Sequence, residues 1–169
     1  FPLATTIGGY AFTQCKVLET VNFPLVTTIG NYAFQYCNAL ETVNFPLATS
    51  MGNSAFKSCK ALETVDSPLL TKIDSGTFES CLLLKTVNCP LTTSMGNSAF
   101  YDCRALETVN FPLPTELPIR AFYNCVALKT ADFSALTTIK SSVFDNCTAL
   151  SSLILRSTRK CTLSATFYN

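Results

Sequence analysis

The chain has no histidine and no tryptophan, and charged residues make up only 14% of its 169 residues. Without histidine, the side chain that most often acts as a general base near neutral pH is missing. The formal net charge is +1, so the chain lacks the basic stripe that binds nucleic-acid phosphates. No apolar run approaches the ~18 residues that a membrane-spanning helix requires. We therefore expect no nucleic-acid partner and no transmembrane segment within this sequence.

The dominant feature that is present is a repeat of 22 residues running from end to end. Cysteine, phenylalanine and leucine each form a column of seven residues with this step. The columns are Cys15, Cys37, Cys59, Cys81, Cys103, Cys125 and Cys147; Phe12, Phe34, Phe56, Phe78, Phe100, Phe122 and Phe144; and Leu18, Leu40, Leu62, Leu84, Leu106, Leu128 and Leu150. A fixed period in this range predicts a solenoid in which each repeat forms one coil.

The second repeat, residues 23–44, shows how one coil is built. Its end, residues 40–45, is rich in β-branched and aromatic residues and predicts a short strand with alternating inward and outward side chains. Pro46 then ends the strand, because proline has no N–H to donate. Residues 27–30 predict a second, shorter extended piece on the opposite side. The glycine at position 30 of this piece does not mark a left-handed site, because Pro118 occupies the equivalent position and proline cannot adopt positive φ.

Residues 31–37 predict a short helical or 3₁₀ turn that leads back to the next strand. Ala33, Phe34 and Cys37 would share its inward face. A coil would thus contain one strand, one short extended piece and one helical turn. A single coil cannot bury enough apolar surface to offset the entropy of ordering it, so neighbouring coils must stack in register. The predicted buried columns are Phe34, Cys37, Leu40, Phe56, Cys59, Leu62, Phe78, Cys81, Leu84, Phe100, Cys103, Leu106, Phe122, Cys125 and Leu128.

The nine cysteines are interpreted as reduced thiols rather than as a disulfide framework. Seven occupy one repeat position beside apolar neighbours, where a free thiol behaves as a small hydrophobe. An odd, in-register column cannot pair fully. Cys89 stands where other repeats have phenylalanine and is also predicted to be buried. No C-x-x-C pair indicates a zinc site, and only Cys161, outside the pattern, is a candidate reactive cysteine.

The outward positions of the predicted strands form polar columns that are the candidate binding face. These residues are Thr20, Asn22, Thr42, Asn44, Thr64, Asp66, Thr86, Asn88, Thr108, Asn110, Thr130 and Asp132. A column of glutamate and lysine, beginning with Glu19, flanks them. The alternative is that stacked threonine and asparagine side chains hydrogen-bond along their own columns and have no ligand. Tyrosines beside the predicted helical turns, such as Tyr10 and Tyr36, are either binding anchors or half-buried packing residues.

The pattern resembles the BspA-like leucine-rich repeats, a short bacterial and protozoan type. The resemblance lies in Leu18-Glu19-Thr20-Val21-Asn22-Phe23-Pro24, Thr28-Ile29-Gly30 and Ala33-Phe34 with Cys37. It implies an α/β repeat fold, a curved solenoid of about seven coils with a parallel β-sheet on the concave face and short extended and helical or 3₁₀ turns on the convex side. It also implies a cell-surface or secreted, adhesin-like protein that binds a protein or glycoprotein through the concave face.

We expect the solenoid to cover residues 1–155, with residues 156–169 forming a C-terminal extension or a truncated cap. A last strand at residues 153–155 would leave the repeat, and Arg156, Arg159 and Lys160 would form a small basic cluster. The chain begins in the middle of a repeat, which indicates a fragment of a longer protein. Without histidine, activated thiols or convergent carboxylates, we expect no enzymatic activity, no cofactor and no metal site. A structural spacer without a ligand is the alternative to the recognition module.

Overall fold

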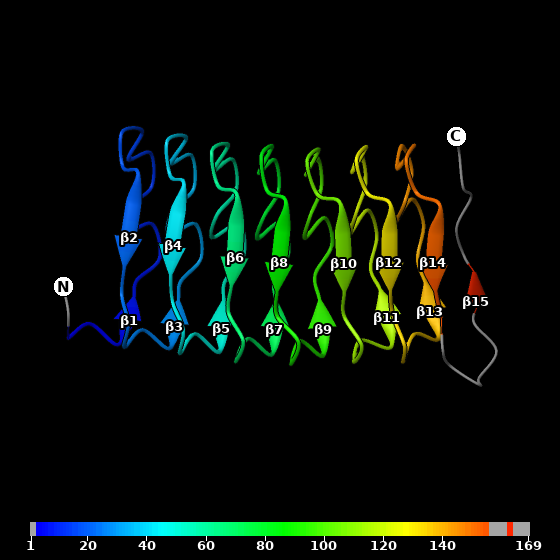
Figure 1. Cartoon of the computed structure of the whole chain (residues 1–169). Helices are drawn as coiled ribbons and strands as arrows, with labels where there is room; N and C mark the ends of the chain where they lie inside the picture. The colour runs from blue at the N-terminus through cyan, green and yellow to red at the C-terminus, as the bar shows by residue number, and fades with distance from the viewer. Residues whose placement is uncertain (1–2, 156–161, 164–169) are drawn as a thin grey trace.

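Seven coils of chain lie side by side in one row, each contributing a longer and a shorter β-strand (Figure 1). The computed structural model describes residues 3–155 and 162–163. The three-residue strands are β2 (Thr20–Asn22), β4 (Thr42–Asn44), β6 (Thr64–Asp66), β8 (Thr86–Asn88), β10 (Thr108–Asn110), β12 (Thr130–Asp132) and β14 (Ser152–Ile154). The two-residue strands are β1 (Thr6–Ile7), β3 (Thr28–Ile29), β5 (Ser50–Met51), β7 (Lys72–Ile73), β9 (Ser94–Met95), β11 (Glu116–Leu117), β13 (Thr138–Ile139) and β15 (Thr162–Leu163).

All strand pairs are parallel, and the register follows the sequence repeat. Thr20 pairs with Thr42, and Thr6 pairs with Thr28, in each case one repeat further along the chain. The two-residue strands form sheets in the order β1-β3-β5-β7-β9 and β11-β13-β15. β14 pairs in register with β12, so the last three-residue strand stays in the stack instead of leaving it as the sequence had suggested. The predicted parallel-strand solenoid with one coil per repeat is confirmed.

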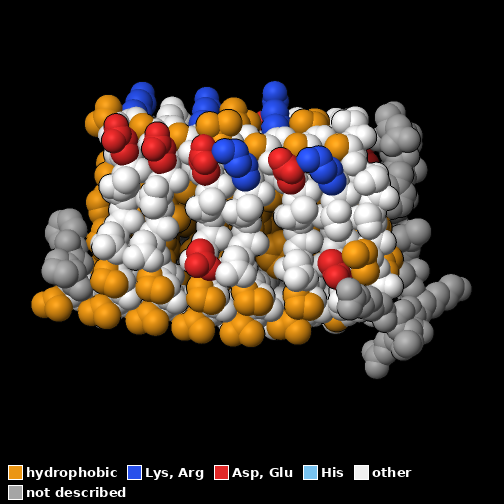
Figure 2. Space-filling view, viewed as in Figure 1, with side chains coloured by type: hydrophobic (Ala, Val, Ile, Leu, Met, Phe, Trp, Pro, Cys, Tyr) orange, Lys and Arg blue, Asp and Glu red, His pale blue; other side chains and the backbone are white. Residues whose placement is uncertain are grey.

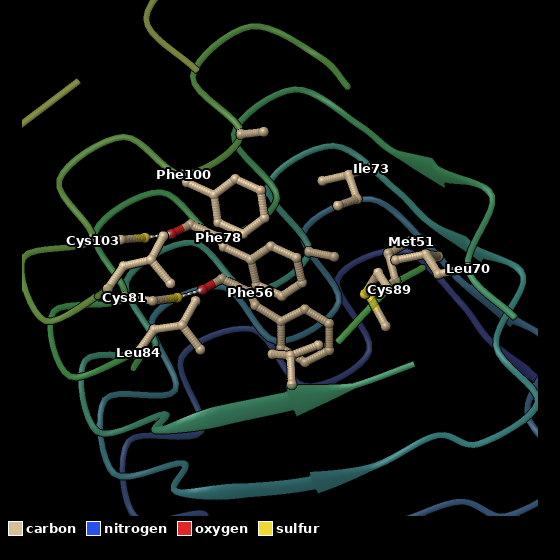
Figure 3. Packing of buried hydrophobic residues seen from close by; sticks show 14 of the residues in the cluster. Met51, Phe56, Leu70, Ile73, Phe78, Cys81, Leu84, Cys89, Phe100 and Cys103 are labelled. Atoms are coloured by element: carbon tan, nitrogen blue, oxygen red, sulfur yellow. Dashed lines mark hydrogen bonds between the residues drawn. The ribbon is translucent and has the colours of Figure 1, made fainter. Parts of the chain in front are cut away.

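The interior is a set of columns in which each residue stacks on its equivalent in the next coil. The rings of Phe56, Phe78 and Phe100 lie nearly parallel, with centroids 5.7 and 5.3 Å apart (Figure 3). Every one of the fifteen predicted core residues from Phe34 to Leu128 is buried with no exposed surface. This packing supplies the burial that an isolated coil lacks.

The cysteines lie beside the phenylalanine column and add a hydrogen bond to it. In six coils the cysteine Sγ–H donates to the phenylalanine carbonyl of the preceding coil, as in Cys81 to Phe56 at 3.2 Å and Cys103 to Phe78 at 3.1 Å (Figure 3). All eight cysteines within the described residues are free thiols, and Cys89 is buried as predicted. Cysteine therefore fills this column as a small apolar residue that also satisfies a buried carbonyl.

The predicted helical or 3₁₀ turn is wrong: among the described residues the chain forms no helix. Tyr32 and Tyr36 have φ of 59° and 62°, and the same two positions are left-handed in every one of the seven coils. A residue with positive φ interrupts a right-handed helix. Alternate N–H groups donate instead to the next coil, as Phe34 N does to Ala55 O at 2.7 Å. The segment is thus a series of tight turns that is hydrogen-bonded to the next coil. The spacing of apolar residues within residues 31–37 does not distinguish these turns from a short helix.

Glycines at the end of the short strands allow neighbouring coils to approach closely. Gly96 does not have positive φ, as expected for this position. A Cβ on Gly96 would lie 2.7 Å from the carbonyl carbon of Asp74 and from Cα of Ser75 in the preceding coil. Gly8 occupies the same repeat position, but a Cβ there would meet no atom within 4 Å.

We expect Gly96→Ala to lower the free energy of unfolding by about 1–3 kcal/mol, because the backbones of two coils must move apart. Gly8→Ala is the matched control and should be neutral or stabilising by up to ~1 kcal/mol, because alanine reduces the entropy of the unfolded chain. Urea denaturation followed by circular dichroism measures both variants. Equal urea midpoints for the two variants would show that the close approach of the coils does not explain glycine at position 96.

Candidate functional site

The outward side chains of the six three-residue strands from β2 to β12 form one polar surface, which we call the strand face. In each strand from β2 to β12 a central residue points inward and two polar residues point outward. The members predicted from the sequence that are exposed are Thr20, Asn22, Thr42, Asn44, Thr64, Asp66, Thr86, Asn88, Thr108 and Asn110, and those that are half-buried are Thr130 and Asp132. The structure thus brings all of them together on one side of the solenoid (Figure 2).

The strand face is divided into three blocks instead of forming one continuous sheet. Hydrogen-bonded sheets join β2 with β4, β6 with β8, and β10 with β12 and β14. Neither β4 and β6 nor β8 and β10 share a sheet, and Figure 2 shows the face hollowed at these two places. Val43 and Val87, on the strand that precedes each hollow, are half-buried, whereas Val65 and Val109, on the strand that follows each hollow, are buried. The resemblance implied one parallel sheet on this side of the solenoid, so the division at the two hollows is a finding of the structure.

The boundaries between blocks coincide with changes in the core residue that follows each strand. Phe23 stacks on Phe45 with ring centroids 6.0 Å apart, and Phe111 stacks on Phe133 at 6.2 Å. Between these pairs the same position holds two smaller buried residues, Ser67 and Cys89. Each boundary therefore falls where a phenylalanine coil meets a coil with a smaller residue. Unequal core side chains change the offset between coils, and the backbone ladder is interrupted there.

Polar side chains on the strand face bond to one another within the blocks. Asn44 Nδ2 donates to Asn22 Oδ1 at 2.9 Å, and Asn88 Nδ2 donates to Asp66 Oδ1 at 2.7 Å. In the flanking column, the ammonium of Lys85 lies 3.0 Å from Glu63 and that of Lys129 lies 2.8 Å from Glu107. These pairs are exposed, so each contributes little to stability. They orient the side chains while leaving their remaining hydrogen-bonding capacity open to solvent.

The buried thiols have the opposite chemistry from a catalytic nucleophile. Burial raises the pKa of Cys37 to about 11 and that of Cys89 to about 12, and it also raises the pKa of Cys81 and Cys103. They are therefore protonated at neutral pH and shielded from reagents. Within residues 3–155 and 162–163, no three histidine, cysteine, aspartate or glutamate side chains converge on a point that could hold a metal ion.

Tyrosines lie in pairs beside the tight turns. Tyr10 stacks on Tyr32 with ring centroids 4.8 Å apart, and Tyr101 stacks on Tyr123 at 4.9 Å. Three of these four rings are half-buried, in agreement with a packing role, and Tyr10 is exposed. A shallow pocket of about 480 Å³ lies near the first pair and includes Gly30, Asn31 and Asp74 in its lining, away from the strand face.

Sequence reasoning missed one surface, a line of exposed leucines directly after the prolines. We call it the leucine row, and it comprises Leu3, Leu25, Leu47, Leu69, Leu91 and Leu113. The signal was present, because this column contains leucine in six successive repeats. Leucine at repeat spacing is typical of buried columns, so the pattern alone does not distinguish this exposed row from the core. The described residues do not include the predicted basic cluster, Arg156, Arg159 and Lys160, or the candidate reactive cysteine, Cys161. Within the described residues, no helix is long and apolar enough to cross a membrane.

The parallel coils of 22 residues define a leucine-rich-repeat solenoid. The family described as "BspA type Leucine rich repeat region" matches residues 3–106 and 71–169, with six copies of its repeat. The chain belongs to this family, so the resemblance seen in the sequence is confirmed. Proteins of this kind are in general interaction modules built on a non-enzymatic scaffold.

Solved structures show the same fold. The leucine-rich repeat protein of T. pallidum is 26% identical, with a TM-score of 0.78 over 88% of this chain and 72% of that chain. A leucine-rich repeat protein from Bacteroides ovatus is 20% identical, with a TM-score of 0.70 over 96% of this chain and 57% of that chain. No curated protein sequence matches the chain. The similarity therefore extends along almost the whole solenoid.

Proposed function

We propose that this chain is a recognition module, exposed on a cell surface or secreted, that binds a protein or glycoprotein partner through the strand face. The family membership of the chain supports this, because leucine-rich repeats commonly present one extended face to a protein ligand. The observation that carries the proposal is the strand face itself, in which outward threonine, asparagine and aspartate side chains are held in order by the buried valines between them. The resemblance makes this the concave face.

The geometry of the strand face favours an extended polar partner over a small molecule. Its side chains form a ribbon several strands long, with both donors and acceptors and few charges, and the two hollows give it relief without an enclosed pocket (Figure 2). Hydrogen bonds to such a ribbon suit peptide backbone, amide side chains or sugar hydroxyls. The paired lysine and glutamate column at its border forms a polar rim.

A structural spacer is the second candidate, and the bonds within the strand face favour it. Asn44 and Asn22, like Asn88 and Asp66, already satisfy part of each other's hydrogen-bonding capacity. A spacer would need only this internal order and the stacked core. The two functions differ in one measurable respect, since only the recognition module has a saturable partner.

The test measures binding to immobilised matrix glycoproteins, with and without enzymatic removal of their glycans. The binding variant replaces four exposed residues at the centre of the face, Thr64, Asp66, Thr86 and Asn88, by alanine. We expect saturable binding that weakens at least tenfold in this variant, because central interface residues dominate affinity. Deglycosylation distinguishes protein from glycan recognition.

The matched control replaces four outward residues of the short strands by alanine. These are Thr28, Ser50, Lys72 and Ser94. The control should bind like the original chain and unfold at a similar temperature. Absence of saturable binding across the matrix panel, or equal loss in both variants, would contradict recognition through the strand face and favour the spacer.

A further inference from the structure

The leucine row is an exposed apolar ridge along one edge of the solenoid. Leu25, Leu47, Leu69, Leu91 and Leu113 are each 40–46% exposed, and Leu3 is 82% exposed. Figure 2 shows apolar side chains in a line along the lower edge, below the strand face. Single exposed leucines are ordinary, but a contiguous row, on the order of several hundred Å², is as large as the largest apolar patch of a typical monomer, and such patches are often functional.

The fold builds this ridge at the tip of a tight turn. In the second coil, Val26 N donates to Phe23 O at 3.2 Å, and the third coil repeats the bond from Ala48 N to Phe45 O at 3.1 Å. Proline occupies the first corner of each turn and leucine the second. The residue after the leucine is buried, as Val26 and Ala48 are, so the leucine itself is not needed to fill the core.

Turn chemistry does not explain leucine at this corner. The second corner of such a turn ordinarily carries asparagine, aspartate, serine or glycine, whose short side chains suit the turn and solvent. Six successive repeats instead carry leucine there. A feature that burial and backbone geometry leave unexplained points to an intermolecular contact.

The turns that carry the row are themselves uncharged, and the nearby charged residues Asp66, Lys72 and Glu116 are of mixed sign. From the residue before each proline to the residue after each leucine, as in residues 23–26, 45–48 and 67–70, no charged side chain occurs. The opposite edge carries Lys16, Lys60 and Arg104, all exposed, and Figure 2 shows cationic side chains along it. Uncharged turns place no like charges together when they meet the same turns of a second copy. The lysines near the row, Lys72 and Lys140, are each paired with a carboxylate, so the row has no free cationic flank of the kind that attracts proteins to anionic lipid surfaces.

We propose that the leucine row is a self-association surface at which two copies of this chain pack row against row around a two-fold axis. A second copy presents leucines at the same step, ~4.8 Å per coil, so the two ridges can interlock along their whole length. Six leucines and the neighbouring prolines supply the apolar centre of an interface whose stable size is about 800 Å² per partner. The bordering threonines and serines form its polar rim, and a two-fold arrangement closes the assembly at a dimer.

Sedimentation equilibrium of the full chain over micromolar to millimolar concentrations tests this proposal. We expect a monomer–dimer equilibrium for the original sequence. Leu69→Glu should raise the dissociation constant at least tenfold, because it places a carboxylate at an apolar contact. Leu83→Glu is the matched control, since Leu83 is 48% exposed at the opposite ends of the strands, and it should leave the equilibrium unchanged. Circular dichroism checks that both variants stay folded.

A charge-complementation experiment identifies the contact directly. A chain with Leu47→Glu and Leu69→Glu and a chain with Leu47→Lys and Leu69→Lys should each be monomeric, and their mixture should form a heterodimer. A monomeric original chain at all concentrations, a dimer unaffected by Leu69→Glu, or a mixture that stays monomeric would each overturn the proposal. So would cosedimentation of the monomer with neutral lipid vesicles through these leucines, which would assign the row to a membrane surface.

Discussion

Raising the pH from 8 to 10 is expected to destabilise the fold by several kcal/mol. Six buried thiols have a pKa raised by burial above the ordinary value of 9.0, namely Cys37, Cys59, Cys81, Cys89, Cys103 and Cys125. In the unfolded chain these thiols ionise near their ordinary pKa, whereas the folded state keeps them protonated. The unfolded state thus binds fewer protons above pH 9, and stability falls as pH rises.

The size of the effect follows from the number of thiols. One unit above the unfolded pKa, each protonated thiol favours unfolding by about 1.4 kcal/mol, and six together give about 8 kcal/mol. Cys147 offsets part of this, because its hydrogen bond with Cys125 lowers its pKa in the folded state. This is comparable with the whole stability of a typical domain, ~5–15 kcal/mol. The stabilisation is complete below pH 9 and is lost as pH rises toward the folded-state values, which begin at about 11 for Cys37. We therefore expect the free energy of unfolding to be much smaller at pH 10 than at pH 8.

Urea denaturation under reducing conditions at pH 7.5, 9 and 10 measures this loss. The control carries Cys81→Ser and Cys103→Ser, which keep a donor toward the carbonyls of Phe56 and Phe78 but cannot ionise in this range. Its absolute stability will be lower, but its slope against pH should be smaller by about two protons, one for each thiol removed. Identical slopes for the two chains would show that the buried thiols are not the cause.

Phe78→Ala is expected to lower the free energy of unfolding by about 3–5 kcal/mol and the melting temperature by about 6–20 °C. Phe78 is fully buried and stacks between Phe56 and Phe100 (Figure 3). Its removal leaves a void between two coils that cannot collapse independently, because each is fixed by strand ladders on the other side. The loss of stability from the missing ring contacts and the loss from the remaining cavity therefore add.

Phe12→Ala provides the comparison at the same repeat position. Phe12 is only half-buried and stacks on one neighbour of its column, Phe34, at 5.0 Å. We expect it to cost roughly half as much as Phe78→Ala, since the lost area scales with burial. Thermal unfolding and urea titration of both variants measure the melting temperatures and the free energies of unfolding. A cost below about 1 kcal/mol for Phe78→Ala would contradict a continuous core shared by all coils.

Several features of the fold were predictable because the repeat imposes them. Once Phe34, Phe56 and Phe78 occupy one repeat position, stacking in register is the arrangement that buries all of them. The same logic predicted buried thiols, and it correctly excluded a left-handed backbone at Gly30 from the proline at position 118. It also predicted which side chains lie on the strand face, since alternation along a strand fixes inward and outward positions.

The tight turns and the division of the strand face were not predictable in this way. Tyr32 and Tyr36 have left-handed backbones although tyrosine does not favour positive φ. Gly76, Asn124 and Asn146 at the same two positions give only a partial signal, and hydrogen bonds to the next coil impose the conformation in every repeat. The hollows depend on how Phe45 meets Ser67 and how Cys89 meets Phe111, which is a difference between neighbouring coils. The pattern that all repeats share does not contain these differences between neighbouring coils.

The sequence by itself determined the solenoid, its register and its buried columns, because a residue repeated at one interval must be accommodated above and below by its own kind. Only the tertiary structure decided where the backbone turns left-handed, where the sheet is interrupted, and that the leucines after the prolines face solvent. Those properties arise from hydrogen bonds between coils and from the direction in which a turn projects its side chain. Neither is encoded in the identity of any single residue.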